Sequence, residues 1–403
     1  MSEWKKCRIG DLVTLRQGFA INAKSKHYIS KERTSLALLR IADMKSGARE
    51  IFIKEDIPQN FIAKKEDIIY TRTGNVGLVF RSNYGVVHNN CFTVTPNEES
   101  VLARDYLFYL LQNKDFYDKA NSLARGAAQP DLPHTLFNSI EILYPSIQTQ
   151  HSIATILSRY DSLIENYQKQ IKLLEEAAQR LYKEWFVDLH FPGHENTKIV
   201  DGVPEGWEKK TIDDVTSKVT TGLNPRKNFV LGKGSNYYVT IKNMADNTFF
   251  LDDRCDKVDS EALEKINKRS DLRIGDILFS GIGTIGRVAL VDIPTNNWNV
   301  SESVFTMRVN DIVTKEFLYL MLLSSDVQNY CQSNAHGAAQ KGIRMADLKA
   351  YRFNLPPLGV IHKFTSLVTP TIKKVSSIRN QIRLLTEARD RLLPKLMSGE
   401  IDV

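Results

Sequence analysis

The chain has 403 residues, enough for two or three domains at about 150 residues each. Hydrophobic residues make up 42% and charged residues 25%, ordinary globular values that exclude a wholly disordered, collagen-like or purely coiled-coil chain. The net charge of +7 suits a polyanionic partner without requiring one.

The cysteines and the apolar stretches indicate the cellular compartment. Cys7, Cys91, Cys255 and Cys331 stand far apart, so none has the spacing of a zinc knuckle or a redox motif. The longest apolar stretch, 317–323, is too short to span a bilayer, and the first residues lack the apolar core of a signal peptide. We therefore expect a soluble, cytoplasmic protein.

The sequence is an internal duplication. Blocks of similar sequence recur in the same order: 4–12 and 207–215, 38–44 and 238–244, 67–79 and 276–288, 126–129 and 337–340, and 170–177 and 381–388. The offset varies among the early blocks and is constant from Gly126 and Gly337 onward. Because each unit is too long for a solenoid repeat, we predict a tandem duplication of a domain, with loops of different length.

Each unit has two parts in chain order. The first part has short alternating or β-branched runs broken by Gly, Asn and Pro, such as 67–70 and 86–95, and predicts mixed α and β structure. The second part has apolar residues at alternating steps of four and three, the seam of a coiled coil. The seam residues are Tyr160, Ile164, Tyr167, Ile171, Leu174, Ala178 and Leu181, and then Val375, Ile378, Ile382, Leu385 and Leu392, with Arg389 at the position of Ala178.

The two helices are predicted to form an antiparallel pair; the alternative is two independent amphipathic helices, each on its own domain. Proline precedes both helices, and Ser146 could cap the first. Pro370 should kink the second helix or delay its start. The turn-rich stretch 191–206 predicts a packed, stiff linker.

These elements predict an α+β fold in which two homologous mixed α/β domains are separated by two long antiparallel coiled-coil helices with pseudo-twofold symmetry. The predicted boundaries are 1–145 for the first domain, 146–188 for the first helix, 189–205 for the linker, 206–357 for the second domain, and 358–403 for the second helix and tail.

One glycine-rich segment, 279–286, contains the G-x-G-x-x-G pattern of nucleotide-binding sites. Such sites need a helix after the glycines, yet residues 287–291 are typical of a strand. Arg72 also replaces Gly281 in the first copy. We therefore favour a β turn whose tip touches a ligand; the alternative is a methyltransferase or nuclease that uses this segment.

Other motifs do not form a catalytic site. His190 and His194 have helical ligand spacing, but the intervening Pro192 and Gly193 exclude a helix, so no metal site is expected. No G-x-x-x-x-G-K-[ST] motif is present, so ATP hydrolysis is not expected.

Basic and polar residues near predicted loops are candidates for DNA binding. Arg72 and Arg287 flank the glycine turns, where the backbone can approach a groove and an arginine can bind guanine through two hydrogen bonds. The full candidate set is Lys24, Lys26, Arg40, Lys45, Arg49, Arg72, Asn75 and Arg81 in the first copy, and Arg226, Lys227, Lys233, Lys242, Thr284 and Arg287 in the second.

In this order the blocks resemble the specificity subunit of Type I restriction-modification enzymes. The likeness covers essentially the whole chain and is carried by the Gly-x-x-Gln blocks at 126–129 and 337–340, the proline-rich helix entries and the tail 392–401. The usual Pro-Leu-x-Glu-Gln at the helix entry is absent: this chain has Pro145-Ser-Ile-Gln-Thr-Gln150 and Pro357-Leu-Gly-Val-Ile-His362.

The resemblance implies a non-catalytic, sequence-specific DNA-binding subunit without a cofactor of its own. Each target-recognition domain would recognise one half of a split, asymmetric DNA sequence, and the seam residues of the helices would set the spacing and dock two methyltransferase subunits. S-adenosylmethionine, ATP and magnesium would belong to the methyltransferase and motor-nuclease partners. The other alternative is a coiled-coil interaction protein that does not bind DNA.

Two consequences can be tested. Removing the Arg72 side chain should affect one half-site only, and inserting helical turns into 168–180 should change the tolerated spacer. A helix of about 35 residues spans roughly 50 Å, enough to place two domains about one turn of DNA apart.

Overall fold

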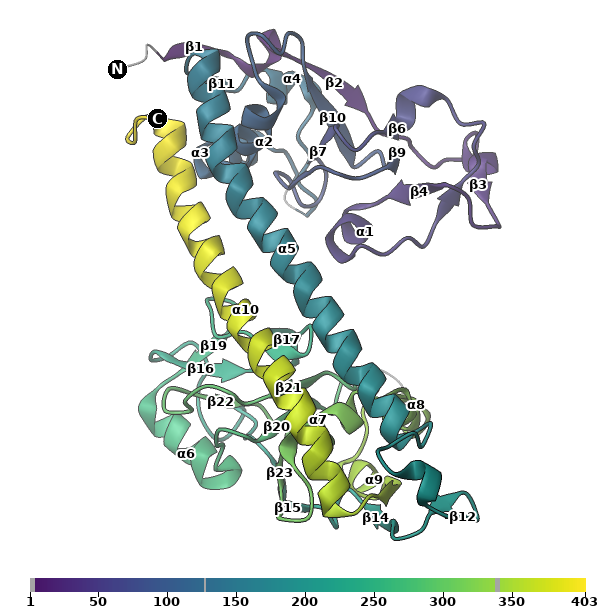
Figure 1. The fold of residues 1–403 in the computed structure, drawn as a ribbon. Coiled ribbons are helices and arrows are strands. Elements are labelled where there is room, and N and C mark those ends of the chain that lie inside the picture. The colour runs from purple at the N-terminus through teal and green to yellow at the C-terminus, as the bar shows by residue number, and fades with distance from the viewer. Residues whose placement is uncertain (1–3, 127, 338–340) are drawn as a thin grey trace. The chain divides into compact units, whose positions relative to one another are not determined.

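The computed structural model describes residues 4–126, 128–337 and 341–403. Its contacts divide the chain into unit 1, residues 1–166 with 381–403, and unit 2, residues 167–380. Both units combine helices with sheets, as the α+β class predicts (Figure 1). In the described part of the chain, no helix is both long and apolar enough to cross a membrane.

The centre of unit 1 is a four-stranded antiparallel sheet in the order β2–β10–β7–β8. Its strands are β2 (Val13–Gln17), β10 (Cys91–Pro96), β7 (Ile68–Thr71) and β8 (Val79–Phe80). Ile68 and Tyr70 of β7 pack into one apolar cluster and Ile69 into another. Both faces of the sheet are therefore covered, which explains why β7 is a continuous apolar run.

Further strands of unit 1 form a five-stranded sheet, β3–β5–β4–β9–β6, and a two-stranded pair, β1–β11. The bounds are β3 (Ile29–Ser30), β5 (Phe52–Ile53), β4 (Leu36–Leu39), β9 (Gly85–Val87), β6 (Ile62–Ala63), β1 (Lys5–Arg8) and β11 (Glu141–Tyr144). The pairing of β4 with β9 is parallel. The helices are α1 (Ile41–Ser46), α2 (Arg104–Gln112), α3 (Lys114–Leu123) and α4 (His134–Asn138).

Unit 2 repeats this arrangement. Its central sheet has the order β15–β23–β20–β21, and β14 pairs with β24. The bounds are β15 (Thr216–Thr221), β23 (Val304–Val309), β20 (Ile277–Ser280), β21 (Val288–Leu290), β14 (Glu208–Thr211) and β24 (Arg352–Leu355). Helices α7 (Lys315–Leu322), α8 (Ser325–Ser333) and α9 (Met345–Lys349) follow in the places of α2, α3 and α4. This shared order confirms the duplication.

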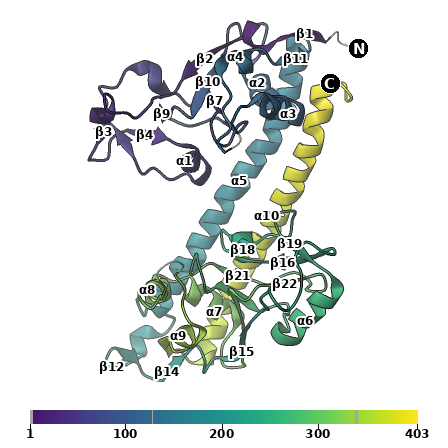
Figure 2. The same ribbon diagram turned by 180° about the vertical axis from the view of Figure 1, so that it is seen from behind.

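The remaining strands of unit 2 are shorter and differ more from unit 1. A three-stranded sheet has the order β19–β16–β22, with β16 parallel to β22 as β4 is to β9. The bounds are β19 (Asp256–Val258), β16 (Asn236–Val239) and β22 (Trp298–Val300), with hairpins β17 (Met244–Ala245)–β18 (Thr248–Phe249) and β12 (Ile199–Val200)–β13 (Val203–Pro204). Helix α6 (Ser260–Ser270) lies beside β22 (Figure 2).

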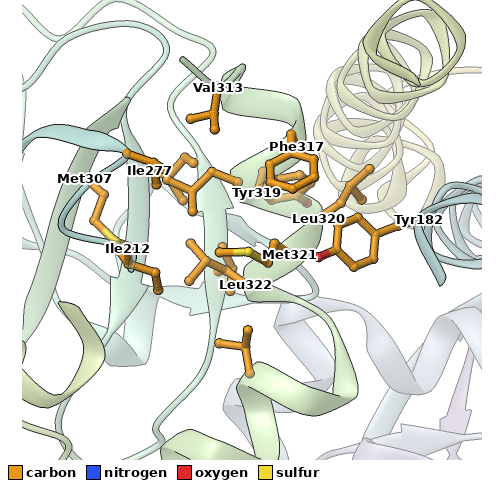
Figure 3. Close-up of a cluster of buried hydrophobic side chains, with 14 of the residues drawn as sticks. Tyr182, Ile212, Ile277, Met307, Val313, Phe317, Tyr319, Leu320, Met321 and Leu322 are labelled. Atoms are coloured by element: carbon orange, nitrogen blue, oxygen red, sulfur yellow. The ribbon is translucent and has the colours of Figure 1, made fainter. Parts of the chain in front are cut away.

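The core of unit 2 joins the central sheet to the helices. Phe317 and Leu320 of α7 lie between the sheet residues Ile277 and Met307 and the ring of Tyr182 (Figure 3). All but the first residue of α7 are buried, including Glu316. Burial on all sides explains why α7 lies in the longest apolar stretch of the sequence.

Two long helices contribute to both units. Helix α5 covers Ile147–Phe186 and α10 covers Leu358–Ser398. In unit 1 the beginning of α5 packs with the end of α10, where Leu157 and Leu396 share a cluster. In unit 2 the end of α5 packs with the beginning of α10, where the rings of Tyr182 and Phe364 lie 6.2 Å apart. The antiparallel pair is therefore confirmed, and each helix also packs on its domain.

The helix termini test two local predictions. The Thr149 backbone N–H donates to Ser146 Oγ at 3.3 Å, so Ser146 caps α5 as predicted. Helix α10 begins at Leu358 and continues through Pro370, so a delayed start was wrong. Along the seam, Ile164, Ala178, Val375 and Ile378 are buried; the half-buried members are Tyr160, Tyr167, Ile171, Leu174, Leu181, Ile382, Leu385 and Leu392.

Candidate nucleic-acid interface

A glycine turn joins equivalent strands in each unit. Gly74 and Gly77 have φ of 82° and 96°, and Gly283 and Gly286 have φ of 80° and 91°, values that favour glycine. The Gly77 N–H donates to Thr71 O at 3.1 Å, and the Gly286 N–H donates to Ser280 O at 3.0 Å. The strand on either side confirms a β turn and not the helix N-terminus that a dinucleotide site requires.

A second segment lies against each turn. The Gly74 N–H donates to Pro130 O at 2.8 Å, and the Gly283 N–H donates to Lys341 O at 2.7 Å. These bonds bring Pro130 and Lys341, which directly follow the repeated Gly-x-x-Gln blocks, next to the glycine turns. Within those segments, residues 127 and 338–340 lie outside the described residues.

In unit 1 a third segment, residues 88–90, lies between the glycine turn and the loop that carries Arg40, another candidate for DNA binding. The Arg72 N–H donates to Asn90 O at 2.8 Å, and the His88 N–H donates to Leu39 O, next to Arg40, at 3.3 Å. Burial, and then the charge of Arg40, lower the pKa of His88. Arg40 itself pairs with Asp43 at 2.7 Å.

In unit 2 Arg287, next to the glycine turn, directly contacts the loop that carries Lys242, another candidate for DNA binding. The Arg287 guanidinium donates through Nη1 to Ile241 O at 2.7 Å and to Met244 O. Lys242 lies between these two carbonyl groups and is exposed, with Nζ 3.1 Å from an Asp256 carboxylate oxygen. Arg287 therefore stabilises the loop that carries Lys242.

The remaining candidates fall into two groups. Half-buried Arg49 donates to Asp43 O and to Asn83 Oδ1, both at 3.1 Å. Half-buried Arg81 lies over the Phe108 ring and 3.4 Å from Asp161 of α5, so it belongs to the junction between domain and helix. The exposed candidates are Lys24, Lys26, Lys45 and Asn75 in unit 1, and Arg226, Lys227, Lys233 and Thr284 in unit 2.

Sequence analysis missed the residues that surround Arg72. Asp131 accepts two hydrogen bonds from the Arg72 guanidinium, at 3.1 and 2.6 Å, and Gln17 accepts a third at 3.1 Å. The hydrogen bond from Arg72 holds the pKa of Asp131 below its ordinary value. His134 stands nearby, and burial and then the Arg72 charge lower its pKa. Asp131 and Gln17 lie far from Arg72 in sequence, so no local pattern indicated them.

Among residues 4–126, 128–337 and 341–403, no group of three or more His, Cys, Asp or Glu side chains could hold a metal ion. The rings of His190 and His194 lie 5.3 Å apart at the start of unit 2's linker.

The profile of the Type I restriction modification DNA specificity domain matches residues 1–176 and 204–384, once in each copy. The chain therefore belongs to this family.

Similar proteins match over nearly their full length. The Type I restriction enzyme MjaIX specificity subunit of Methanocaldococcus jannaschii is 27% identical over 100% of this chain and 94% of the relative. The HindI specificity subunit of Haemophilus influenzae is 23% identical, with 100% of both chains covered. The crystal structure of a Type I restriction-modification S subunit from M. genitalium has the same fold, with a TM-score of 0.59, 18% identity, and 98% and 96% of the two chains covered. These matches identify a specificity subunit, which recognises DNA and does not catalyse.

Proposed function

We propose that each unit recognises one half of a split, asymmetric DNA target. The observation that carries this proposal is the repetition, in each unit, of the same glycine turn with the same second segment bonded to it. The side chains at the two turn tips differ, Asn75 in one and Thr284 in the other, so the two units present different groups on one scaffold. Different groups on a shared scaffold suit two different half-sites.

The candidate residues have different roles in this proposal. The exposed lysines and arginines contact phosphates, which supply affinity that depends on salt but carry no sequence information. Arg72, Asn75, Thr284 and the Lys242 loop face base edges. Arg81 stabilises the helix junction instead.

The helices set the distance between the half-sites and dock two methyltransferase subunits. Both helices run through the two units, α5 with 40 residues and α10 with 41. Duplicated surfaces suit two copies of one partner. S-adenosylmethionine, ATP and magnesium belong in this proposal to the methyltransferase and motor-nuclease subunits, and the present chain supplies recognition alone.

The proposal is tested by selecting DNA from a random library with the complex of this chain and its methyltransferase subunits. We expect two short defined blocks separated by a fixed number of unspecified base pairs. Methylome sequencing of cells that carry the complex should return the same sequence. One uninterrupted recognition sequence, or no sequence preference at moderate salt, would contradict the proposal.

Spacing is tested by inserting seven residues after Asn166 in α5 and seven after Asn380 in α10. These positions lie at the division between the two units. Seven residues preserve the heptad register and add about 10 Å, close to three base pairs. The unspecified spacer should lengthen by about three base pairs while both defined blocks stay the same. An unchanged spacer would refute the measuring role of the helices.

A further inference from the structure

The Arg72 side chain is held by acceptors on several sides. Its Nε and Nη2 donate to the two carboxylate oxygens of Asp131 at 3.1 and 2.6 Å, and Nη1 donates to Gln17 Oε1 at 3.1 Å. The Thr73 hydroxyl donates to Asp131 Oδ1 at 2.5 Å, which fixes the carboxylate. Paired hydrogen bonds between a guanidinium and a carboxylate constrain the plane of both groups.

The backbone around Arg72 is fixed as well. Its N–H donates to Asn90 O at 2.8 Å, and its carbonyl accepts from the Leu132 N–H at 2.9 Å. Asp131 sits on the segment that this second bond ties to the turn. Backbone hydrogen bonds therefore hold the segments of Arg72 and Asp131 at a fixed distance from each other.

The held guanidinium still has donors to offer. An arginine side chain carries five N–H groups, and these contacts use three of them. The side chain is 21% exposed, so the group lies at the surface of the turn. A free arginine loses rotamer entropy when it binds, whereas a side chain that is already fixed has lost most of it before binding. Two N–H groups on a fixed plane match the O6 and N7 acceptors of guanine.

Unit 2 lacks this arrangement at the equivalent place. Gly281 and Gly342 stand at the positions of Arg72 and Asp131, as the matching backbone bridges of Ile282 with Gly342 and of Thr73 with Asp131 show. A Cβ atom on Gly281 would lie 2.3 Å from Cζ of Phe305. An arginine cannot enter this position without displacing the buried Phe305 ring.

We propose that Asp131 and Gln17 are positioning residues that hold Arg72 as a fixed reader of guanine, a device that the equivalent described positions of unit 2, Gly281 and Gly342, do not carry. The half-site of unit 1 therefore contains a G·C pair whose recognition depends on the Asp131 carboxylate. This inference rests on the proposed function.

The test uses the complex with methyltransferase subunits and the random DNA library. We expect one guanine, in one block, to lose its preference about 10- to 100-fold in Arg72→Ala and about 10-fold in Asp131→Asn. Gln17→Ala should weaken the same position and no other. Asp131→Glu should restore part of the preference, because it restores the charge.

The matched control is Glu99→Gln, which breaks the 2.7 Å pair between Glu99 and Arg104 in the same unit. It should leave both blocks unchanged. If Asp131→Asn leaves every preference unchanged, or weakens both blocks equally through a lower thermal stability, the inference is overturned while the proposed function stands. A wild-type complex that selects no two-part sequence would overturn both this inference and the proposed function.

Discussion

At equivalent positions the two units join their domains to the helices with different chemistry. In unit 1 Asp161 of α5 accepts from Arg389 of α10 at 2.8 Å and from the Tyr109 hydroxyl at 2.6 Å, and Arg81 approaches it to 3.4 Å. At the aligned positions of unit 2 stand Ile372, Ala178, Leu320 and Leu290. One duplicated junction has thus become a polar network in one copy and an apolar cluster in the other.

This difference shows how a repeated helix pair acquires a defined pairing. An apolar cluster such as the one that contains Ala178 and Ile372 stabilises without selecting a particular partner; in unit 2 the pair of Arg379 with Glu175, at 2.6 Å, is what joins the helices by charge. A partly buried pair such as Asp161 with Arg389 costs desolvation, but it penalises any arrangement that leaves one charge without its partner. If either long helix paired with a second copy of itself, Asp161 would face an alanine or Arg389 an isoleucine. The polar network therefore favours pairing between α5 and α10.

The largest loss of stability is expected when the charge of unit 1 is placed into the apolar junction of unit 2. Ala178→Arg buries a guanidinium in a cluster where Ala178 is 5% exposed. We expect a loss of about 4 kcal/mol in the free energy of unfolding of unit 2, because an unpaired charge is desolvated. Hydrogen exchange of the backbone amides of unit 2 measures this loss of stability. Adding Ile372→Asp should recover part of the loss, and a single variant as stable as the wild type would refute this account.

The reverse change removes one charge from unit 1. Arg389→Met should cost about 3 kcal/mol, because Asp161 keeps its burial and loses its closest cation. In a double-mutant cycle with Asp161→Asn, the combined loss should fall short of the sum by about 1 to 2 kcal/mol. Chemical denaturation followed on unit 1 measures this coupling. Strictly additive losses would show that the two side chains do not interact.

The glycine turns differ in the space they leave. Gly281→Ala should cost about 2 kcal/mol, since its Cβ would press against the Phe305 ring. Gly74→Ala, in the first turn, is the comparison variant: nothing lies within 4 Å of its Cβ, and only its positive φ opposes the change. Thermal unfolding should show the larger loss for Gly281→Ala. Equal losses would mean that the Phe305 ring yields to the added Cβ at little cost.

The smallest expected effect is a loss of stability at low pH. The pKa of Asp131 is lowered from its ordinary 3.8, first by the hydrogen bond from Arg72. A lowered pKa gives stability that is present above the ordinary value and lost as the pH falls below it. The side chain is 36% exposed, so the contribution is about 1 kcal/mol or less. The stability difference between wild type and Asp131→Asn should shrink from about pH 5 to about pH 3; a constant difference would contradict the assignment.

Much of the fold could be predicted because repetition and periodicity are visible in sequence. The duplicated blocks, the two helices, the cap at Ser146 and the strand–turn–strand around Gly74 all depend on local patterns. Contacts across the sheets could not be predicted in this way. Asp131 meets Arg72 only because a distant segment bonds to the turn, and the orientation of Arg287 toward Ile241 depends on a loop of unit 2 alone.

The two turn tips provide the most direct test of recognition by separate units. Asn75 and Thr284 occupy matching exposed positions, so Asn75→Thr and Thr284→Asn each transplant the other tip without disturbing a core. DNA selection with each variant complex should show a change in one block for Asn75→Thr and in the other block for Thr284→Asn, with the spacer unchanged. Changes in the same block, or in both blocks at once, would contradict the claim that each unit recognises its own half of the target.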